Sequence, residues 1–411
     1  MQLNPVWAVC GALGMGTALF LPLVRVAPNR LMSGEPLGLA QLLSPTVGWA
    51  VALTLLLVVP LAWGVRSRCA LAWPDHGGFG QDRSAQPGWV MPGVVLVLMA
   101  LGVAALLALA GQHASQVALT ESPYARTSFG AGFWSLLGLA LLVSLDALRQ
   151  LPASSMGRSA VWLGLALPSL VVLGLGWGND LSLLKEYANR SDVFWQAVLR
   201  HGQIVLLATL PSVLLGLALA WACARHVRLQ RGVLALLNLI QTIPSIALFG
   251  LFMAPLAWVA ARYPVLAQAG ISGVGLAPAV LALILYSLLP LVRSALAALA
   301  AVPVAVKTAA QAMGMSGWQI LWRVELPLAW PVLLPGLRTA VTQTIGLAAV
   351  TALVGAGGLG ALMFEGLFSA ANDLVLLGVL PIVLMAVLAD ALFKGLTMWA
   401  SPSAQVVGGA R

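Results

Sequence analysis

Residues 303–327 have the sequence PVAVKTAAQAMGMSGWQILWRVELP. Good helix formers follow Pro303, which suits a first helical turn, and Gly314 stands where a glycine would end that helix. Ser316 and Gln319 match the S-x-x-Q capping box that opens a second helix. The segment is therefore predicted to form a helix, a tight turn and a second helix.

The two predicted helices differ in how they end and in what they expose. Pro327 and Pro331 are expected to stop the second helix, because proline lacks a backbone donor and clashes with the preceding turn. The first helix is expected to expose the small residues Ala309 and Ala310, so that another surface can approach closely. An amphipathic helix resting on lipid is the alternative. It is weakened because Lys307 is the helix's only basic residue.

The composition of the whole chain excludes most other classes of protein. Of its 411 residues 61% are hydrophobic and 8% are charged, against about 25% charged in an ordinary soluble domain. So few polar side chains cannot cover the surface of a soluble enzyme, a secreted disulfide scaffold or a disordered tail. The chain is predicted to be an all-α integral membrane protein with many spans.

About ten apolar runs are long enough to be read as membrane spans, which need roughly 20 residues each. The run at 233–261 is overlong and contains Pro244 and Pro255, so it is expected to be kinked or broken. Strands are not expected, because the runs are continuous rather than alternating. The runs are 6–24, 47–63, 90–110, 129–145, 160–177, 204–223, 233–261, 274–291, 332–354 and 374–393.

Charge and composition divide the chain and orient it. With ten spans and a cytoplasmic N-terminus, twice as many Lys and Arg fall inside as outside, which favours N-in and C-in. We expect an N-terminal membrane extension of about five spans at 1–177 and an external polar segment at 178–202. These are followed by a membrane core at 203–398, which contains a cytoplasmic loop at 303–327. A cytoplasmic tail at 399–411 is expected at the end.

Several kinds of chemistry have no residues to carry them. Cys10, Cys69 and Cys223 are too few and too far apart for a metal site or a disulfide framework. The net charge of +9 is scattered, so no nucleic-acid patch forms. The chain has no phosphate-binding loop and no acidic residue at a span centre, which favours energy supplied by another subunit. We expect no catalytic residue, no metal and no bound cofactor.

Polar residues inside the C-terminal runs raise a question of role. Asn238, Gln241 or Thr242, and Ser245 recur at helical spacing and are predicted to share one helix face. Such a face contacts either another helix or a water-filled path, and the two alternatives remain open. The same question applies to Thr339, Thr342, Gln343, Thr344 and Thr351.

Glycines at 355–360 spell G-x-G-x-x-G, but they follow a membrane run instead of a βαβ strand, so a nucleotide site is rejected. Close packing or bending at a span end, at an external gate, is the expected role of Gly355, Gly357, Gly358 and Gly360.

The segment at 303–327 resembles the EAA loop of ABC-importer permeases, E-A-A-x-x-x-G followed ten residues later by an aliphatic-x-L-P. Thr308 stands where that family has Glu, which puts in doubt any salt bridge from this position to an ATPase. The resemblance implies that the loop is the coupling helix, seated on a separate ATP-hydrolysing subunit. The residues in register are Ala309, Ala310, Gly314, Val324, Leu326 and Pro327.

Two further segments resemble the permeases of osmoprotectant, or quaternary amine, importers. They are the QTIPS stretch within 238–245 and the T-x-x-x-G-A-G-G-L-G stretch at 351–360. With the loop, the resemblance covers about residues 200–395. Residues 1–177 lie outside that core, as in the long forms of this subfamily.

The resemblance implies a five-helix type I permease core in a bacterial inner membrane, importing a compatible solute such as glycine betaine by alternating access. The chain would be a transport subunit rather than an enzyme, with ATP and Mg²⁺ on its partner. Implied partners are ATPase subunits, a periplasmic or lipid-anchored binding protein, a second permease copy or paralogue, and membrane lipid. The alternative is a ten-span ion-coupled secondary transporter. A membrane-embedded enzyme is disfavoured, because no His, Cys and Asp cluster occurs at span ends.

Overall fold

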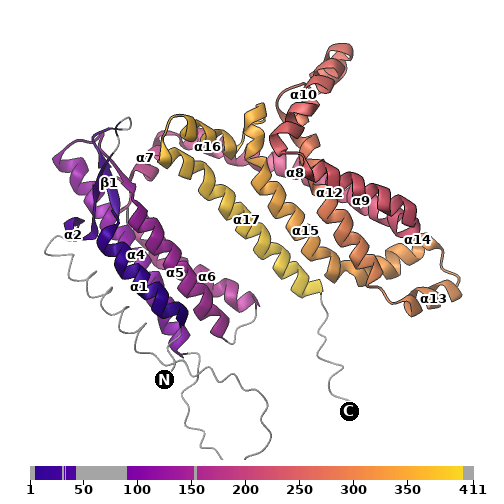
Figure 1. The fold of residues 1–411 in the computed structure, drawn as a ribbon, viewed down its shortest axis with the longest axis horizontal. Coiled ribbons are helices and arrows are strands. Elements are labelled where there is room, and N and C mark those ends of the chain that lie inside the picture. The colour runs from indigo at the N-terminus through magenta and orange to yellow at the C-terminus, as the bar shows by residue number, and fades with distance from the viewer. Residues whose placement is uncertain (1–4, 30–31, 33, 43–89, 152–154, 401–411) are drawn as a thin grey trace, which may run out of the picture. The chain divides into compact units, whose positions relative to one another are not determined.

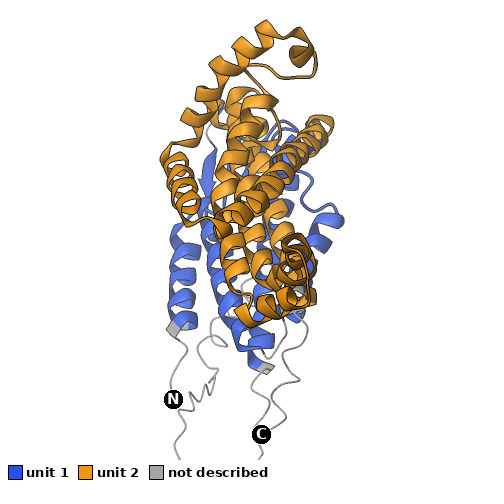
Figure 2. Ribbon diagram, turned by 90° about the vertical axis from the view of Figure 1, so that its right-hand side faces the viewer, with its two compact units in different colours: residues 1–188 blue, residues 189–411 orange. Residues whose placement is uncertain are grey.

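The computed structural model describes residues 5–29, 32, 34–42, 90–151 and 155–400. These residues form two compact units, 1–188 and 189–411 (Figure 2). The expected span at 47–63 and the C-terminal tail beyond 400 lie outside the described residues. Among the described residues, seven helices are long and apolar enough to cross a membrane, and three shorter apolar helices accompany them.

The first unit combines helices with a small sheet. Two of its described helices are long and apolar enough to cross a bilayer, and two shorter apolar helices accompany them. Four pack into two buried apolar clusters, one of which includes the sheet. The helices are α1 (Pro5–Phe20), α2 (Leu39–Leu42), α4 (Val90–Thr120), α5 (Ala131–Gln150), α6 (Ser155–Gly174) and α7 (Ser182–Asn189).

The sheet corrects the expectation that strands are absent. β1 (Val24–Ala27) pairs antiparallel with β2 (Glu35–Leu37) on one side and with β3 (Arg126–Phe129) on the other. Segments of three or four residues are too short for alternation to reveal them. Gly130 allows the closure, because a Cβ there would lie 2.3 Å from the Pro22 carbonyl oxygen.

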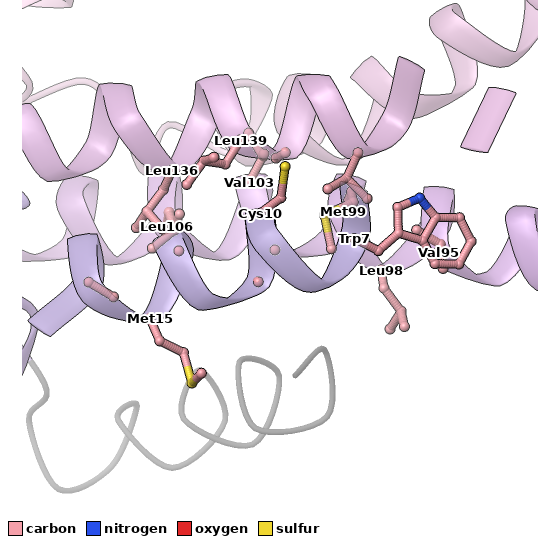
Figure 3. A pocket seen from close by; sticks show the side chains of 16 residues that line it. Trp7, Cys10, Met15, Val95, Leu98, Met99, Val103, Leu106, Leu136 and Leu139 are labelled. Atoms are coloured by element: carbon pink, nitrogen blue, oxygen red, sulfur yellow. The ribbon is translucent and has the colours of Figure 1, made fainter. Parts of the chain in front are cut away.

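An apolar pocket of about 150 Å³ lies in the first unit among α1, α4 and α5 (Figure 3). Trp7 and Cys10 line it from α1, Val95 and Leu106 from α4, and Leu136 from α5. Gly11 and Gly14 of α1 leave room that larger side chains would fill.

The described part of the second unit consists of helices joined by turns and short loops (Figure 1). α12 is its central element and packs against both α8 and α15, with Leu288, Val292 and Ala295 in the buried cluster between them. The helices before the loop are α8 (Ser191–Arg225), α9 (Val227–Thr242), α10 (Ser245–Arg262), α11 (Pro264–Gln268) and α12 (Leu276–Ala300).

The remaining helices begin at the predicted loop. They are α13 (Val304–Ala312), α14 (Gly317–Ile320), the π-helical turn η1 (Leu321–Glu325), α15 (Leu326–Ala348), the 3₁₀ turn η2 (Val350–Val354), α16 (Leu359–Phe368) and α17 (Asn372–Ala400).

Two structural details bear on the expected spans of this unit. The overlong run at 233–261 is broken at Pro244 into α9 and α10, as predicted. α8 begins at Ser191, so the polar residues from 191 to 202 form the start of this 35-residue helix. The expected external segment at 178–202 thus contains α7 and the first turns of α8, and its position outside the membrane stays a prediction.

Candidate functional site

The predicted coupling segment has the caps that its sequence indicates. Gly314 has φ +79° at the end of α13, and its N–H donates to the Gln311 carbonyl at 2.9 Å. The Ser316 hydroxyl accepts from the Gln319 N–H at 3.3 Å, while the Gln319 side chain accepts from the Ser316 N–H at 2.8 Å. The helix, turn and capping box are thus confirmed.

The second helix does not stop at Pro327 and Pro331, which corrects the sequence prediction. α14 continues through η1 into α15, and the Leu326 N–H bonds to the Leu321 carbonyl across the π turn. Pro327 lies in the first turn of α15, where proline is tolerated. Pro331 and Pro335 lie inside α15, and prolines are accepted in membrane helices because neighbouring groups satisfy the freed carbonyls.

The two alanines of the loop lie in different environments. Ala310 is 2% exposed, whereas Ala309 and Thr308 face outward. The expectation that both alanines are exposed is therefore wrong for Ala310, because its side of α13 packs onto the chain itself. Thr308 bonds its own helix through the Val304 carbonyl at 3.1 Å.

Lys307 links α13 to the rest of the unit. Its Nζ lies 3.0 Å from a Glu325 carboxylate oxygen of η1 and donates to the Leu299 carbonyl of α12 at 3.1 Å. Val324 and Leu326, on either side of Glu325, are half-buried, and Pro327 is exposed. These two contacts join α13 to α12 and to the π-helical turn that precedes α15.

The polar residues around Pro244 do not share one face, which corrects that expectation. Ser245 begins α10 beyond the break, so its direction is independent of Asn238 and Gln241. Asn238 Oδ1 accepts from Arg293 Nη2 at 2.7 Å, and Gln241 Nε2 donates to the Tyr286 carbonyl at 2.7 Å. These two residues join α9 to α12, which is the role of interhelix contact.

Thr242 has a different position, since its hydroxyl is exposed and bonds to the Leu239 carbonyl of its own helix, at 2.7 Å. On α15, the half-buried Thr342 bonds back to the Arg338 carbonyl at 2.9 Å, and Gln343 is also half-buried. Thr351 is fully buried in η2 and donates to Ala348.

The glycine turn at 355–360 has a backbone that other residues cannot easily adopt. Gly355, Gly357 and Gly358 have φ of +84°, +82° and +79°. A Cβ on Gly360 would lie 1.9 Å from the Ala349 carbonyl oxygen, so the start of α16 lies directly against the end of α15. The chain therefore bends at this turn and packs closely at Gly360, and the expected role at an external gate stays a prediction.

Two residues of α8 contact this turn and were not singled out from the sequence. Arg200 Nε donates to the Ala356 carbonyl at 3.0 Å. His201 is fully buried, its Nε2 donates to the Ile345 carbonyl at 3.1 Å, and its ring lies 3.3 Å from where a Cβ on Gly358 would be. A polar Arg-His pair inside a long apolar helix was the available signal.

A second missed pair lies at the centre of the unit. The Ser287 and Thr344 hydroxyls are 2.8 Å apart and join α12 to α15 out of contact with solvent. Within the ranges that the structure describes, no group of three or more His, Cys, Asp or Glu could bind a metal ion.

Comparison with known families finds two matches. Residues 212–402 match the family described as binding-protein-dependent transport system inner membrane component. Residues 3–74 and 84–184 match the family described as ABC transporter permease YehY, N-terminal domain. The two matches fall on either side of the boundary between the two structural units.

Individual relatives resemble the second unit. The osmoprotectant import permease protein OsmW of Salmonella typhimurium is 39% identical over 203 residues, covering 49% of this chain and 89% of that protein. The glycine betaine/carnitine/choline transport system permease protein OpuCD of Bacillus subtilis is 35% identical over 53% of this chain and 88% of its own. The ergothioneine transport permease/ergothioneine binding protein EgtU of Helicobacter pylori is 42% identical over 38% of this chain and 26% of its own.

Proposed function

We propose, from the premise that this chain belongs to the family of binding-protein-dependent transport system inner membrane components, that it imports a compatible solute of the quaternary amine type, such as glycine betaine. The chain is a multi-pass membrane permease of an ABC importer, and ATP is hydrolysed on a separate subunit. It is a transport subunit rather than an enzyme, and it works with an ATPase and a solute-binding protein. The alternative of an ion-coupled carrier is therefore set aside.

The observation that carries the choice of solute is the likeness to OsmW, which extends over 89% of that protein. In this proposal the matched region includes the helices that surround the translocation path. EgtU, whose name specifies ergothioneine, favours that compound as a second candidate, because its 157-residue match is 42% identical.

In this proposal α13 and the turn after it seat on the ATPase, with Thr308 and Ala309 as the exposed contact residues. We expect Arg200 and His201 of α8, together with the glycine turn, to form a gate at the outer end of the path. Thr242, Ser245, Thr342 and Gln343 are candidates for the lining of the path, whereas Asn238 and Gln241 connect helices. ATP and Mg²⁺ bind only the partner, and this chain binds no cofactor of its own.

A second permease, either a copy or a paralogue, completes the path in this proposal. α10 supports it, because it is the least buried of the seven candidate spans: 11% of its 18 residues are buried. Ile246, Leu251 and Trp258 lie exposed along it. Membrane lipid covers whatever part of these surfaces the second permease leaves open.

Reconstitution tests the proposal. The full chain is placed in liposomes with its ATPase and binding protein, and uptake of labelled glycine betaine and of labelled ergothioneine is measured with ATP inside. We expect betaine uptake that stops when ATP is replaced by a non-hydrolysable analogue and continues when ion gradients are collapsed. Uptake of ergothioneine alone would move the assignment to the second candidate, and ATP-driven uptake of neither would contradict the choice of solute.

A further inference from the structure

A polar cavity of about 410 Å³ lies beside the coupling segment in the second unit, between the ends of α8 and α12 and the helices α13 and α14. Its volume is in the range of small-ligand sites, roughly 300–1,000 Å³. Six of the residues that line it are polar or aromatic with a polar atom: Trp221, Arg225, Gln230, Lys307, Gln311 and Glu325.

The cavity has a net positive charge with one cation available for a ligand. Lys307 is neutralised by Glu325, since their charged atoms are 3.0 Å apart. Arg225 is the remaining charge, and no carboxylate of the described residues forms an ion pair with it. An anion is therefore the ligand that the charge favours.

The Arg225 guanidinium is positioned before any ligand arrives. Its central carbon lies 4.0 Å from the centroid of the Trp221 ring, a cation–π contact. A Cβ on Gly317 would be 3.2 Å from Arg225 Nη2, so the guanidinium also lies close against the start of α14. A planar guanidinium fixed in this way presents paired donors that match a phosphate group.

Neutral donors complete the lining. The Trp221 indole forms part of the wall, while its Nε1 is buried away from the open space. Gln230 and Gln311 reach the cavity from α9 and α13 and add amide donors.

We propose that this cavity binds a phosphate-bearing ligand, which connects the coupling helix α13 to the end of α8. The phosphate can come from a phospholipid headgroup or from a soluble phosphate compound. The ring centroids of Trp221 and Trp318 are 6.1 Å apart, and those of Trp318 and Trp322 are 5.6 Å apart. Trp318 and Trp322 are exposed, and tryptophan prefers the headgroup level of a bilayer. The proposal concerns a site distinct from the path and does not depend on which solute is imported.

The test uses the purified, delipidated full chain and follows its thermal unfolding, because a ligand that binds the folded state raises the melting temperature. Phosphatidylglycerol supplies the headgroup, glycerol 3-phosphate supplies the same chemistry in soluble form, and a galactosyl diacylglycerol supplies a lipid without phosphate. We expect a saturable rise with phosphatidylglycerol if the source is lipid, or with glycerol 3-phosphate if it is soluble. No rise with either, or an equal rise with the galactolipid, would overturn the proposal.

Substitutions assign the effect to the cavity. Arg225→Gln is expected to weaken the apparent affinity about tenfold or more, the value of a charge-assisted contact. Arg228→Gln removes an exposed arginine that does not line the cavity and is expected to leave the affinity unchanged. Should Arg225→Gln not fold, Gln311→Leu at an exposed lining position is expected to lower the affinity several-fold. Unchanged affinity in the folded lining variant, or an equal loss in Arg228→Gln, would contradict the site.

Discussion

At the scale of single residues, Ala309 and Ala310 show how neighbours in one motif have different roles. Both match the same family pattern, yet only Ala309 faces outward, whereas Ala310 is 2% exposed. The pattern therefore combines Ala310, which packs inside the chain, with Ala309, whose exposed side chain can contact a partner.

Substitution by glutamate separates these two roles. Ala310→Glu is expected to lower the free energy of unfolding by about 3–5 kcal/mol, because it buries an unpaired charge. Ala309→Glu is expected to leave stability within about 0.5 kcal/mol of the unmodified chain, as for most surface changes. It should nevertheless reduce ATP-driven uptake, because the added side chain keeps α13 from its partner. Denaturation and liposome uptake measure the two effects, and full uptake with Ala309→Glu would contradict the assigned contact face.

Glycines of the second unit give a matched pair. A Cβ on Gly360 would lie 1.9 Å from the Ala349 carbonyl oxygen, whereas a Cβ on Gly346 would meet nothing within 4 Å. Gly360→Ala is expected to cost about 1–3 kcal/mol through overpacking. Gly346→Ala should be neutral or stabilise by roughly 0.5–1 kcal/mol, because alanine suits a helix interior better. Melting of the two purified variants decides the matter, and equal melting temperatures would contradict the close approach of α16 to α15.

At the scale of elements, the ion pair between Lys307 and Glu325 is the side-chain link between α13 and η1. A double-mutant cycle with Lys307→Gln and Glu325→Gln is expected to give a coupling energy of about 0.5–1 kcal/mol, since both groups remain partly solvated. Both single variants should also lower the uptake driven by each ATP hydrolysed. Additive effects on stability, with the transport ratio unchanged, would show that the pair does not connect these elements.

The sequence predicted the elements that depend on local chemistry. The end of α13 at Gly314 and the capping box at Ser316 follow from side chains within a few residues, and so does the break at Pro244. The continuation past Pro327 was missed because the π turn before it depends on packing that local rules do not include. The three-stranded sheet was missed because β1 pairs with β3, about a hundred residues away.

The candidate site divides in the same way. The residues of the coupling loop could be named from the sequence, since they form one continuous motif. The contacts of Arg200 with Ala356 and of His201 with Ile345 join residues more than 140 positions apart, so spacing could not reveal them. Helical periodicity placed Ser245 with Asn238, and the break between α9 and α10 separates them.

At the scale of the whole molecule, the two units correspond to two separate family matches, and the OsmW and OpuCD relatives cover only about half of this chain. Residues 189–411 expressed with a start methionine are therefore expected to insert and fold without the first unit. Co-expression of 1–188 as a second chain should leave that stability unchanged. Proteolysis of membranes and circular dichroism of the purified piece measure this. If residues 189–411 are degraded when expressed alone but not when 1–188 is co-expressed, the second unit requires the first.

The expected orientation can be tested on the same molecule. A cysteine at the exposed Asn179 should react with an impermeant reagent from outside. One at Met313, which is 75% exposed at the end of α13, should react only after the membrane is opened. Cys10 and Cys223 are buried and give little background, and Cys69→Ser removes the third thiol. External labelling at Met313 would contradict the cytoplasmic position of the coupling loop.

The length of α8 has a mechanical consequence. Its 35 residues extend about 52 Å at 1.5 Å per residue, well beyond the roughly 30 Å of hydrocarbon in a bilayer. Arg225 is its last residue and lies beside the coupling segment, and Arg200, its tenth residue, contacts the glycine turn. A continuous helix of this length acts as a lever, so a tilt of about 10° pivoting at one end displaces the other by about 9 Å. A small tilt about the end at the coupling segment therefore becomes a displacement of several ångströms at the far end of the helix.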